Sequence, residues 1–267
     1  MKITRSFRAA LAALILTFPP VLAVAPATAA PLPTIVLVHG AFADTTSWNG
    51  VAAVLRDHGY PVVVPDNPLR GPANDAAAVQ RALDTISGPI VLVGHSYGGF
   101  VISNVHDPKV QALVYIAAFA PVQGEIGLLE LDPIRFPGSQ LVPPTLQFSV
   151  VDDPNGLAGR NLDSYIAPDR FNEVFAQDVG PDVAADLLAH QRSLAVAANI
   201  EPSGAPAWSS IPSRFLVSAY DHVIPPAAQR FMANRMGATT SEIASSHASL
   251  VSHPAEVAAV VESAAGQ

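Results

Sequence analysis

A serine between two glycines ends an apolar run in the sequence VLVGHSYGGF, residues 91–100. Gly94 and Gly98 lie two places on either side of Ser96, which is the spacing of the strand–turn–helix motif called a nucleophile elbow. The serine of such a motif takes a strained backbone conformation that holds its hydroxyl above the sheet, and the glycines leave room where strand and helix nearly touch. Because a strand pattern precedes the turn and an apolar helical pattern follows it, we predict a nucleophile at Ser96 rather than an incidental serine in a glycine-rich turn.

A serine hydroxyl is a poor nucleophile at neutral pH, so it needs a general base, and the base needs an acid that orients it. With this type of elbow, the chain order is serine, acid, histidine, and the later two follow strands. Asp221 directly follows the apolar run RFLVSAY, and no other acidic residue beyond Ser96 stands at the end of a predicted strand. We therefore predict Asp221 as the acid. A role as a turn or helix-capping residue is the alternative.

Eight histidines compete for the role of the base. His247 follows the last predicted strand, 26 residues beyond Asp221, and we predict it as the base. His253 precedes Pro254 at a predicted helix start, which favours a capping role. His222 is next to Asp221 in sequence, on the wrong side of a short loop to reach it easily. These two histidines remain the alternatives.

Two backbone N–H groups should stabilise the oxyanion that forms when the nucleophile attacks. Tyr97 follows the nucleophile, and Ala41 lies in the loop after the first predicted strand, so we predict their amides as the donors. Phe42 and Trp48 are candidates for the lining of the pocket, although Trp48 could equally anchor the first helix. This chemistry requires no metal and no cofactor. The absence of cysteine excludes disulfides, cysteine-based zinc sites and a cysteine nucleophile.

Six short apolar runs alternate with stretches of helical spacing, and these elements must position the candidate residues. Runs that are apolar throughout indicate strands buried on both faces, as in a parallel sheet flanked by helices. The predicted strands cover 34–40, 61–66, 89–94, 112–119, 214–221 and 239–244, and the predicted helices 47–59, 73–86, 97–105, 225–237 and the end of the chain. We predict an α/β fold with a mostly parallel six-stranded sheet.

The alternation stops between residues 122 and 210, after the fourth predicted strand. This stretch is rich in proline, contains no comparable strand pattern and has helical spacing only near 168–177 and 181–194. We therefore predict a helical cap inserted into the domain, and we expect substrate specificity to depend on it.

Residues 1–30 have the layout of a secretory signal peptide, with a basic start, an apolar run over 9–18 and small residues around Ala29 and Ala30, where cleavage would occur. The apolar run is much shorter than a bilayer span, which disfavours the alternative of an uncleaved anchor. We expect a secreted or periplasmic protein whose single domain covers 31–267.

Charge and composition narrow the possible partners. Cleavage would leave 11 Lys and Arg against 22 Asp and Glu, a formal charge of −11. This balance disfavours nucleic acids and anionic membrane surfaces, so we expect a small-molecule substrate and no stable membrane association. The chain is 50% hydrophobic and only 13% charged, which is enough for a large core. No pattern in the sequence indicates an oligomeric state.

Five segments resemble one branch of the α/β-hydrolase superfamily, which contains plant methyl-ester esterases, hydroxynitrile lyases and related bacterial hydrolases. These segments are LVHGAF, LVGHSYGGFV, YIAAFAP, SAYDHVIP and SSHASLVSHP. The resemblance runs from about Pro33 to the C-terminus and is weak across 122–210, where that branch carries a helical cap. It implies a catalytic triad of Ser96, Asp221 and His247 and oxyanion donors at Ala41 and Tyr97.

The residues and the resemblance together predict a serine hydrolase that cleaves a small to medium ester through an acyl-enzyme. A lactonase, a thioesterase and a cofactor-free perhydrolase with the same triad are alternatives, as is a non-catalytic small-molecule receptor on the same fold. Members of the branch that cleave cyanohydrins carry a lysine directly after the catalytic histidine. Ala248 occupies that position here, so we expect no such lyase activity.

Overall fold

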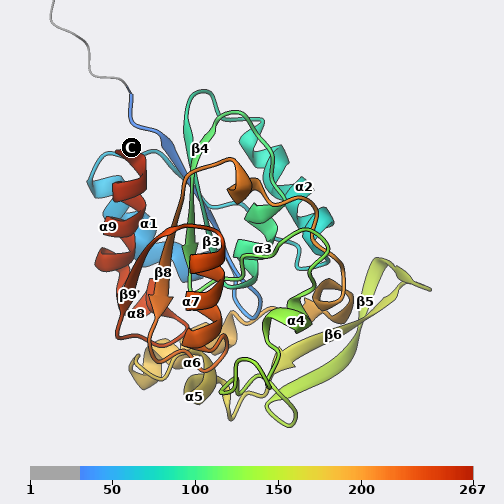
Figure 1. Ribbon diagram of the computed structural model, residues 1–267. Helices are drawn as coiled ribbons and strands as arrows, with labels where there is room; N and C mark the ends of the chain where they lie inside the picture. Colours follow the sequence, from blue (N-terminus) through green and yellow to red (C-terminus); the bar gives the residue numbers. More distant parts are fainter. Residues whose placement is uncertain (1–30, 267) are drawn as a thin grey trace, which may run out of the picture. The chain divides into compact units, whose positions relative to one another are not determined.

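The computed structural model describes residues 31–266, and its centre is a six-stranded sheet (Figure 1). The strands are β1 (Thr34–Val38), β2 (Val62–Val63), β3 (Ile90–His95), β4 (Val110–Ile116), β8 (Ser213–Ser218) and β9 (Thr239–Ile243). Their order is β2-β1-β3-β4-β8-β9, and every neighbouring pair is parallel. The prediction of a mostly parallel six-stranded sheet is therefore confirmed. The predicted signal peptide, residues 1–30, lies outside the described residues.

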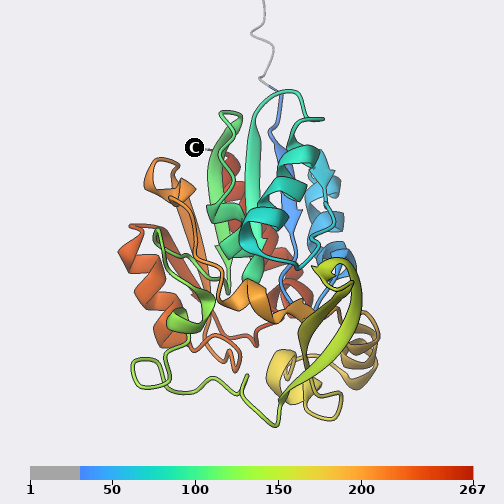
Figure 2. The ribbon, with the colours of Figure 1, turned by 90° about the vertical axis from the view of Figure 1, so that its right-hand side faces the viewer.

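Helices cover both faces of the sheet, and the alternation of side chains along each strand divides the core into two clusters. In β1, Ile35 and Leu37 pack in one cluster with α1 and α9, whereas Val36 and Val38 pack in the other with α2, α3 and α7. The helices are α1 (Asn49–Asp57), α2 (Pro72–Leu83), α3 (Tyr97–Ser103), α7 (Pro226–Arg235), α8 (Ser249–Ser252) and α9 (Pro254–Ala265). Figure 2 looks onto α2 and α3, with α9 behind the sheet. None of the helices within residues 31–266 is long and apolar enough to span a bilayer.

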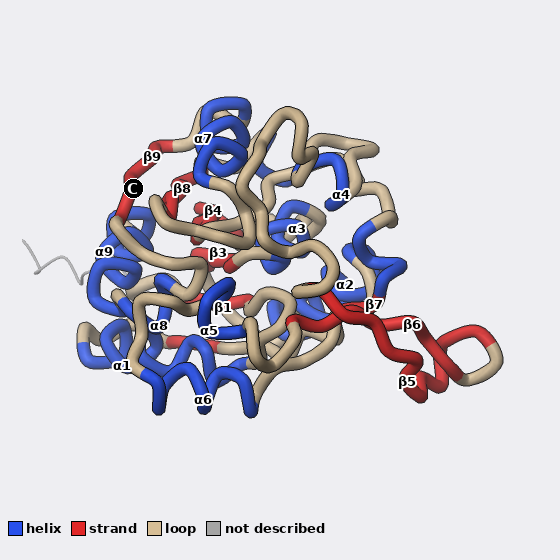
Figure 3. The backbone as a smooth tube through the Cα atoms, turned by 90° about the horizontal axis from the view of Figure 1, so that it is seen from below, coloured by secondary structure: helices blue, strands red, loops and turns tan. Residues whose placement is uncertain are grey.

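The insertion after β4 lies where the sequence predicts it, but it is not purely helical. It contains α4 (Gly127–Glu130), β5 (Leu146–Leu157), β6 (Arg160–Ile166), α5 (Phe171–Phe175), α6 (Pro181–Ala189), β7 (Leu194–Ala195) and the 3₁₀ helices η2 (Val196–Asn199) and η3 (Ala207–Ser209). Strands β5, β6 and β7 form a separate antiparallel sheet, and Figure 3 shows the β5–β6 hairpin projecting from the other elements. The prediction of a helical cap is therefore corrected: the cap contains a three-stranded sheet as well as helices. Most of β5 is exposed, so its sequence lacks the continuous apolar run that marks a buried strand.

Candidate active site

Ser96 occupies the sharp turn between β3 and α3, with a φ of +53° that non-glycine residues adopt rarely. The turn is held by its backbone. The N–H of Ser96 donates to the carbonyl of Ile116 at 3.2 Å, and the carbonyl of Ser96 accepts from the N–H groups of Gly99 and Phe119 at 2.9 and 3.1 Å. These bonds from β4 and from the chain beyond it keep a strained residue in place.

The two glycines of the elbow are required by close backbone contacts. A Cβ atom on Gly94 would lie 2.5 Å from the carbonyl oxygen of Gly98, and a Cβ atom on Gly98 would lie 2.5 Å from the carbonyl oxygen of Val38 in β1. Real Cβ atoms essentially never approach backbone oxygens so closely. The glycine spacing in the sequence therefore reports the contact of α3 with β1 and β3.

Replacement of Gly98 by alanine is expected to lower the free energy of unfolding by about 1–3 kcal/mol, because the backbone of β1 must move away from the new methyl group. Urea denaturation measures this change. Gly180 is the matched control, since no atom lies within 4 Å of a Cβ atom at that position. Gly180→Ala should change the free energy by no more than about 0.5 kcal/mol, as for other surface substitutions. Equal stabilities of the two variants would contradict the contact.

Asp221 and His247 form a buried pair at the ends of neighbouring strands. Asp221 follows β8, His247 follows β9, and Asp221 Oδ2 lies 2.7 Å from His247 Nδ1. Both side chains are fully buried. With the proton on Nδ1 donated to the carboxylate, the lone pair of His247 is on Nε2, as a general base requires. That Nε2 atom is buried and has no hydrogen-bond partner within residues 31–266.

The other oxygen of Asp221 also fulfils the alternative role considered from the sequence. Asp221 Oδ1 accepts hydrogen bonds from the backbone N–H groups of Val223 and Ile224, at 2.7 and 2.9 Å. The carboxylate thus fixes the turn after β8 and contacts the imidazole at once. The two alternative histidines are engaged elsewhere, since His222 bonds the carbonyl of Glu173 and His253 bonds the hydroxyl of Ser252.

Gln229 holds the acid in place and was not singled out from the sequence. Its Nε2 donates to Asp221 Oδ2 at 2.7 Å and to the carbonyl of Ile224 at 2.8 Å, while its Oε1 accepts from the N–H of Ser218 at 3.0 Å. Gln229 is fully buried on α7. A polar residue on the buried face of a predicted helix, eight positions after the acid, is the signal that could have identified it.

His95 links the elbow to the loop between β9 and α8 that carries His247, which we call the histidine loop. Its ring centroid lies 4.7 Å from that of His247, and its Nε2 bonds the backbone carbonyl of His247 at 2.9 Å. Burial lowers the pKa of His95 well below its ordinary value, and the neighbouring His247 adds to this effect. His95 is therefore neutral and donates Nε2–H to that carbonyl. Because His95 directly precedes Ser96, this contact brings the elbow and His247 into one site.

The cap also contacts the histidine loop. The N–H of Ala248 donates to the carbonyl of Phe175 at 3.1 Å, and the N–H of Ser246 donates to Asp178 Oδ2 at 2.8 Å. The ring of Phe175 stands edge-on to that of His247, with centroids 5.1 Å apart. The position of His247 thus depends on the cap as well as on β9.

The structure does not join Ser96 and His247 by a hydrogen bond. In the described part of the chain, neither the Ser96 hydroxyl nor His247 Nε2 has a hydrogen-bond partner. Catalytic hydrogen bonds in substrate-free enzymes are often long and tighten only in the complex with substrate. Neither atom therefore has an existing hydrogen bond that a reacting group would have to displace.

The two predicted oxyanion donors flank the same space as Ser96. The backbone N–H groups of Ala41 and Tyr97 make no hydrogen bond within the described chain, and both residues line a cavity together with Ser96. The Tyr97 hydroxyl donates to Asp75 Oδ2 at 2.7 Å, which fixes the first turn of α3. A Cβ atom on Gly40 would lie 2.7 Å from Ser96 Cβ, so the turn after β1 is pressed against the elbow.

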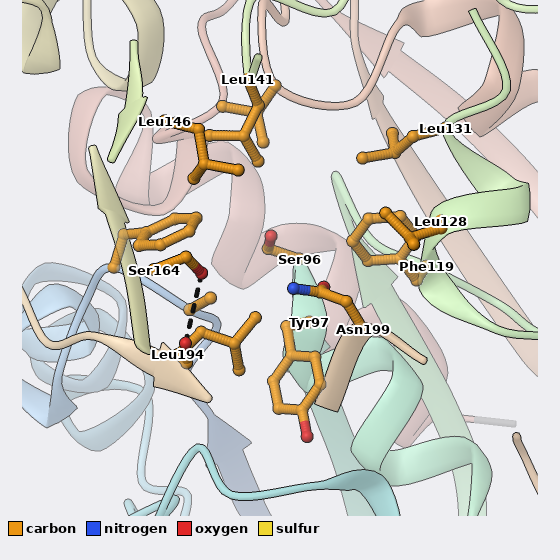
Figure 4. A pocket seen from close by; sticks show the side chains of 13 residues that line it. Ser96, Tyr97, Phe119, Leu128, Leu131, Leu141, Leu146, Ser164, Leu194 and Asn199 are labelled. Carbon is orange, nitrogen blue, oxygen red and sulfur yellow. Dashed lines mark hydrogen bonds between the residues drawn. The ribbon is translucent and has the colours of Figure 1, made fainter. Parts of the chain in front are cut away.

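The cavity at Ser96, together with its opening to solvent, contains about 510 Å³ of space that no protein atom occupies (Figure 4). Seven of its thirteen lining residues come from the cap. The lining residues are Ala41, Phe42, Ser96, Tyr97, Phe119, Leu128, Leu131, Leu141, Leu146, Ser164, Leu194, Asn199 and Val223, none of which is charged at neutral pH. Residues 31–266 also contain no cluster of three or more His, Cys, Asp or Glu side chains that could hold a metal ion.

Of the two predicted pocket residues, the structure places Phe42 in the lining and Trp48 outside it. Trp48 is fully buried in the core between the sheet and α1, with Val51 and Leu55, and its ring meets that of His95 edge-on at 6.4 Å. Trp48 therefore anchors the first helix, which is the alternative considered from the sequence. The large apolar ring is buried by the helix that begins directly after it.

A partly buried ion pair ties the cap sheet to the core. Arg70, in the loop before α2, donates two hydrogen bonds to Asp163 on β6 at 2.7 and 2.8 Å, and Ser193 donates a third at 2.6 Å. Asp163 and Ser193 each precede a residue that lines the cavity, namely Ser164 and Leu194. The bidentate pair therefore fixes the cap wall that faces Ser96.

Comparisons with known proteins agree with this architecture. A model of the alpha/beta hydrolase family matches residues 35–260. The chain is 27% identical over 254 residues to a pyrethroid hydrolase of Sphingobium wenxiniae, and the alignment covers 85% of each protein. It is 36% identical over 117 residues to a carbendazim hydrolyzing esterase of Nocardioides sp. (strain SG-4G); this alignment covers 38% of the chain and only about half, 48%, of that esterase.

Among solved structures, polyneuridine aldehyde esterase has a TM-score of 0.74 with this chain at 18% sequence identity. The superposition covers 87% of this chain and 98% of that esterase. At this level of identity the similarity establishes the fold alone.

Proposed function

The chain belongs to the alpha/beta hydrolase family, and we propose that it is a serine hydrolase that cleaves small to medium, uncharged carboxylic esters. The observation that carries this proposal is the buried Asp221–His247 pair, whose imidazole has an unpartnered Nε2 and lies next to His95, the residue before Ser96. The apolar cavity above the elbow supports uncharged substrates, because a charged group would lose its hydration there without a partner. The relatives named above as an esterase and as a hydrolase are consistent with it.

In the proposed mechanism, the Ser96 oxygen attacks the ester carbonyl while His247 Nε2 takes the hydroxyl proton. The N–H groups of Ala41 and Tyr97 stabilise the resulting oxyanion. His247 then gives the proton to the departing alcohol, and the acyl group remains on Ser96. Water, deprotonated by the same imidazole, releases the acid and restores the serine. Asp221 keeps the proton on His247 Nδ1 throughout.

We also propose where the reaction takes place and with which partners. A signal peptide over residues 1–30 would direct the enzyme to the periplasm or the exterior, where a small-molecule ester is its partner. The excess of acidic residues supports the absence of nucleic-acid and membrane partners.

A series of p-nitrophenyl esters tests the reaction. We expect hydrolysis of short and medium acyl chains and little hydrolysis of the palmitate, because the cavity is of limited volume. We also expect p-nitrophenyl butyrate to exceed the hemisuccinate of similar length by about tenfold or more in kcat/KM, since burial of the free carboxylate is unfavourable.

Covalent capture by a fluorophosphonate separates an enzyme from a receptor. The intact protein should lose enzymatic activity in step with capture. Absence of both hydrolysis and capture would favour a small-molecule receptor, and hydrolysis of thioesters or lactones in preference to esters would favour the alternative hydrolases.

A further inference from the structure

Besides the nucleophile, one polar side chain of the cavity has no hydrogen-bond partner among residues 31–266. Apart from the nucleophile and Tyr97, only Ser164 and Asn199 bring hydrogen-bonding side chains to the lining. Ser164 donates its hydroxyl hydrogen to the carbonyl of Leu194 at 3.2 Å, as Figure 4 shows. The side-chain amide of Asn199 makes no hydrogen bond to any residue in the described range 31–266. Asn199, which is half-buried, therefore offers an unused donor at the lining of a largely apolar space.

The side chain of Asn199 lies next to Gly127 of α4. A Cβ atom built on Gly127 would lie 3.6 Å from Asn199 Oδ1, so the amide oxygen lies on the side of Gly127. The amide nitrogen is directed the other way, into the cavity and toward Ser96 and Tyr97 (Figure 4). The N–H groups of Asn199 thus face the space that an acyl group on Ser96 would fill.

The segment that carries Asn199 is fixed on both sides. Before it, the N–H of Ala195 donates to the carbonyl of Leu69 at 3.0 Å. After it, Glu201 Oε1 accepts from the N–H of Ala73 at 2.9 Å, and the N–H of Ser203 donates to the carbonyl of Glu125 at 2.8 Å. A donor on a segment held in this way is preorganised, so little ordering opposes a hydrogen bond to a ligand.

We propose that Asn199 determines specificity by donating a hydrogen bond to an oxygen acceptor within the acyl chain of the substrate. The inference rests on the proposed ester hydrolysis at Ser96, because the acyl chain is the part that stays in the cavity through both half-reactions. An apolar acyl chain would leave the amide unpaired, whereas an ether or keto oxygen would satisfy it. The favoured substrates are therefore esters of oxygen-substituted acids rather than of plain fatty acids.

Esters of equal chain length test this assignment. The probes are p-nitrophenyl hexanoate and three analogues in which an ether oxygen replaces the methylene at the third, fourth or fifth position. Each kcat/KM is divided by the rate constant for alkaline hydrolysis of the same ester, which removes the electronic effect of the oxygen. The wild type should prefer at least one ether ester over hexanoate by about 3- to 10-fold. In Asn199→Leu this preference should disappear while hexanoate is still hydrolysed.

Two further variants separate hydrogen bonding from shape. Asn199→Asp keeps the size of the side chain but has no N–H group, so it should also lose the preference. Ser164→Ala changes another polar residue of the same wall, whose hydrogen is already used, and should keep the preference. Thermal unfolding midpoints confirm that all three variants are folded.

The outcomes distinguish this inference from the proposed function. Hydrolysis of hexanoate with no preference for any ether ester would overturn the role of Asn199 alone. A proportional loss on all four esters in Asn199→Leu would also overturn it, since a general effect on catalysis or folding would then explain the loss. Failure of the wild type to hydrolyse any ester would refute the proposed function and this inference together.

Discussion

Replacement of Ser96 by alanine is expected to lower kcat for p-nitrophenyl butyrate by about 10⁶-fold, because no other group can form the acyl-enzyme. The same variant should show no covalent capture by a fluorophosphonate. The fold should be unaffected, since the Ser96 hydroxyl makes no hydrogen bond within the described chain and the backbone bonds of the turn do not involve it. Steady-state kinetics, mass spectrometry of the labelled protein and thermal unfolding measure the three effects.

Ser249 provides a matched control for this substitution. Its hydroxyl is also buried and has no partner in the described residues, and it lies at the start of α8, only two positions after His247. Ser249→Ala should keep the activity and the labelling of the wild type. Retention of either property in Ser96→Ala would show that another residue is the nucleophile and would remove the basis of the proposed mechanism.

The centre of the main sheet could be predicted because β1, β3 and β4 are buried on both faces and are therefore apolar at nearly every position, whereas the edge strand β9 is mostly exposed. All six residues of β3 are buried. The cap sheet could not be predicted in the same way. In β5 most side chains face solvent, and Phe148 and Val150 are 49% and 60% exposed. Strand β5 is stabilised by pairing with β6, and the hairpin by the ion pair of Arg70 and Asp163. Neither interaction produces a periodic pattern of apolar residues in the sequence.

The residues of the candidate site also divide into those that the sequence predicts and those that it does not. The positions of Ser96, Asp221 and His247 after strands could be predicted because the sequence pattern marks each of those strands. Their chain order is also characteristic of this type of elbow. Gln229 could be recognised only as a polar residue on the buried face of a predicted helix. Asn199 could not be predicted, because its role depends on what the cap places opposite it. The donors of the oxyanion site are backbone groups, so only the turn and not the side chain marks them.

Asp221→Asn is expected to lower kcat by about 10⁴-fold while changing KM little, because the amide would move the proton of the histidine from Nδ1 to Nε2. An asparagine can still accept the N–H groups of Val223 and Ile224 with its oxygen. Its NH₂ group would then face His247 Nδ1, so the lone pair would move to Nδ1 and the proton to Nε2. In that tautomer the imidazole cannot accept the hydroxyl proton of the nucleophile. Steady-state kinetics on p-nitrophenyl butyrate measure the loss.

The same substitution should also reduce stability, and this effect must be separated from the loss of the base. The new NH₂ group would face the Nε2 of Gln229, now 2.7 Å from Asp221 Oδ2, so two donors would oppose each other in a buried place. Asp107→Asn is the control, since it alters another buried carboxylate at the opposite end of the sheet, before β4. It should lower the unfolding midpoint with kcat nearly unchanged. If Asp221→Asn lowered kcat no more than Asp107→Asn, the carboxylate would serve the turn after β8 alone, and the orientation of His247 would depend on Phe175 and His95.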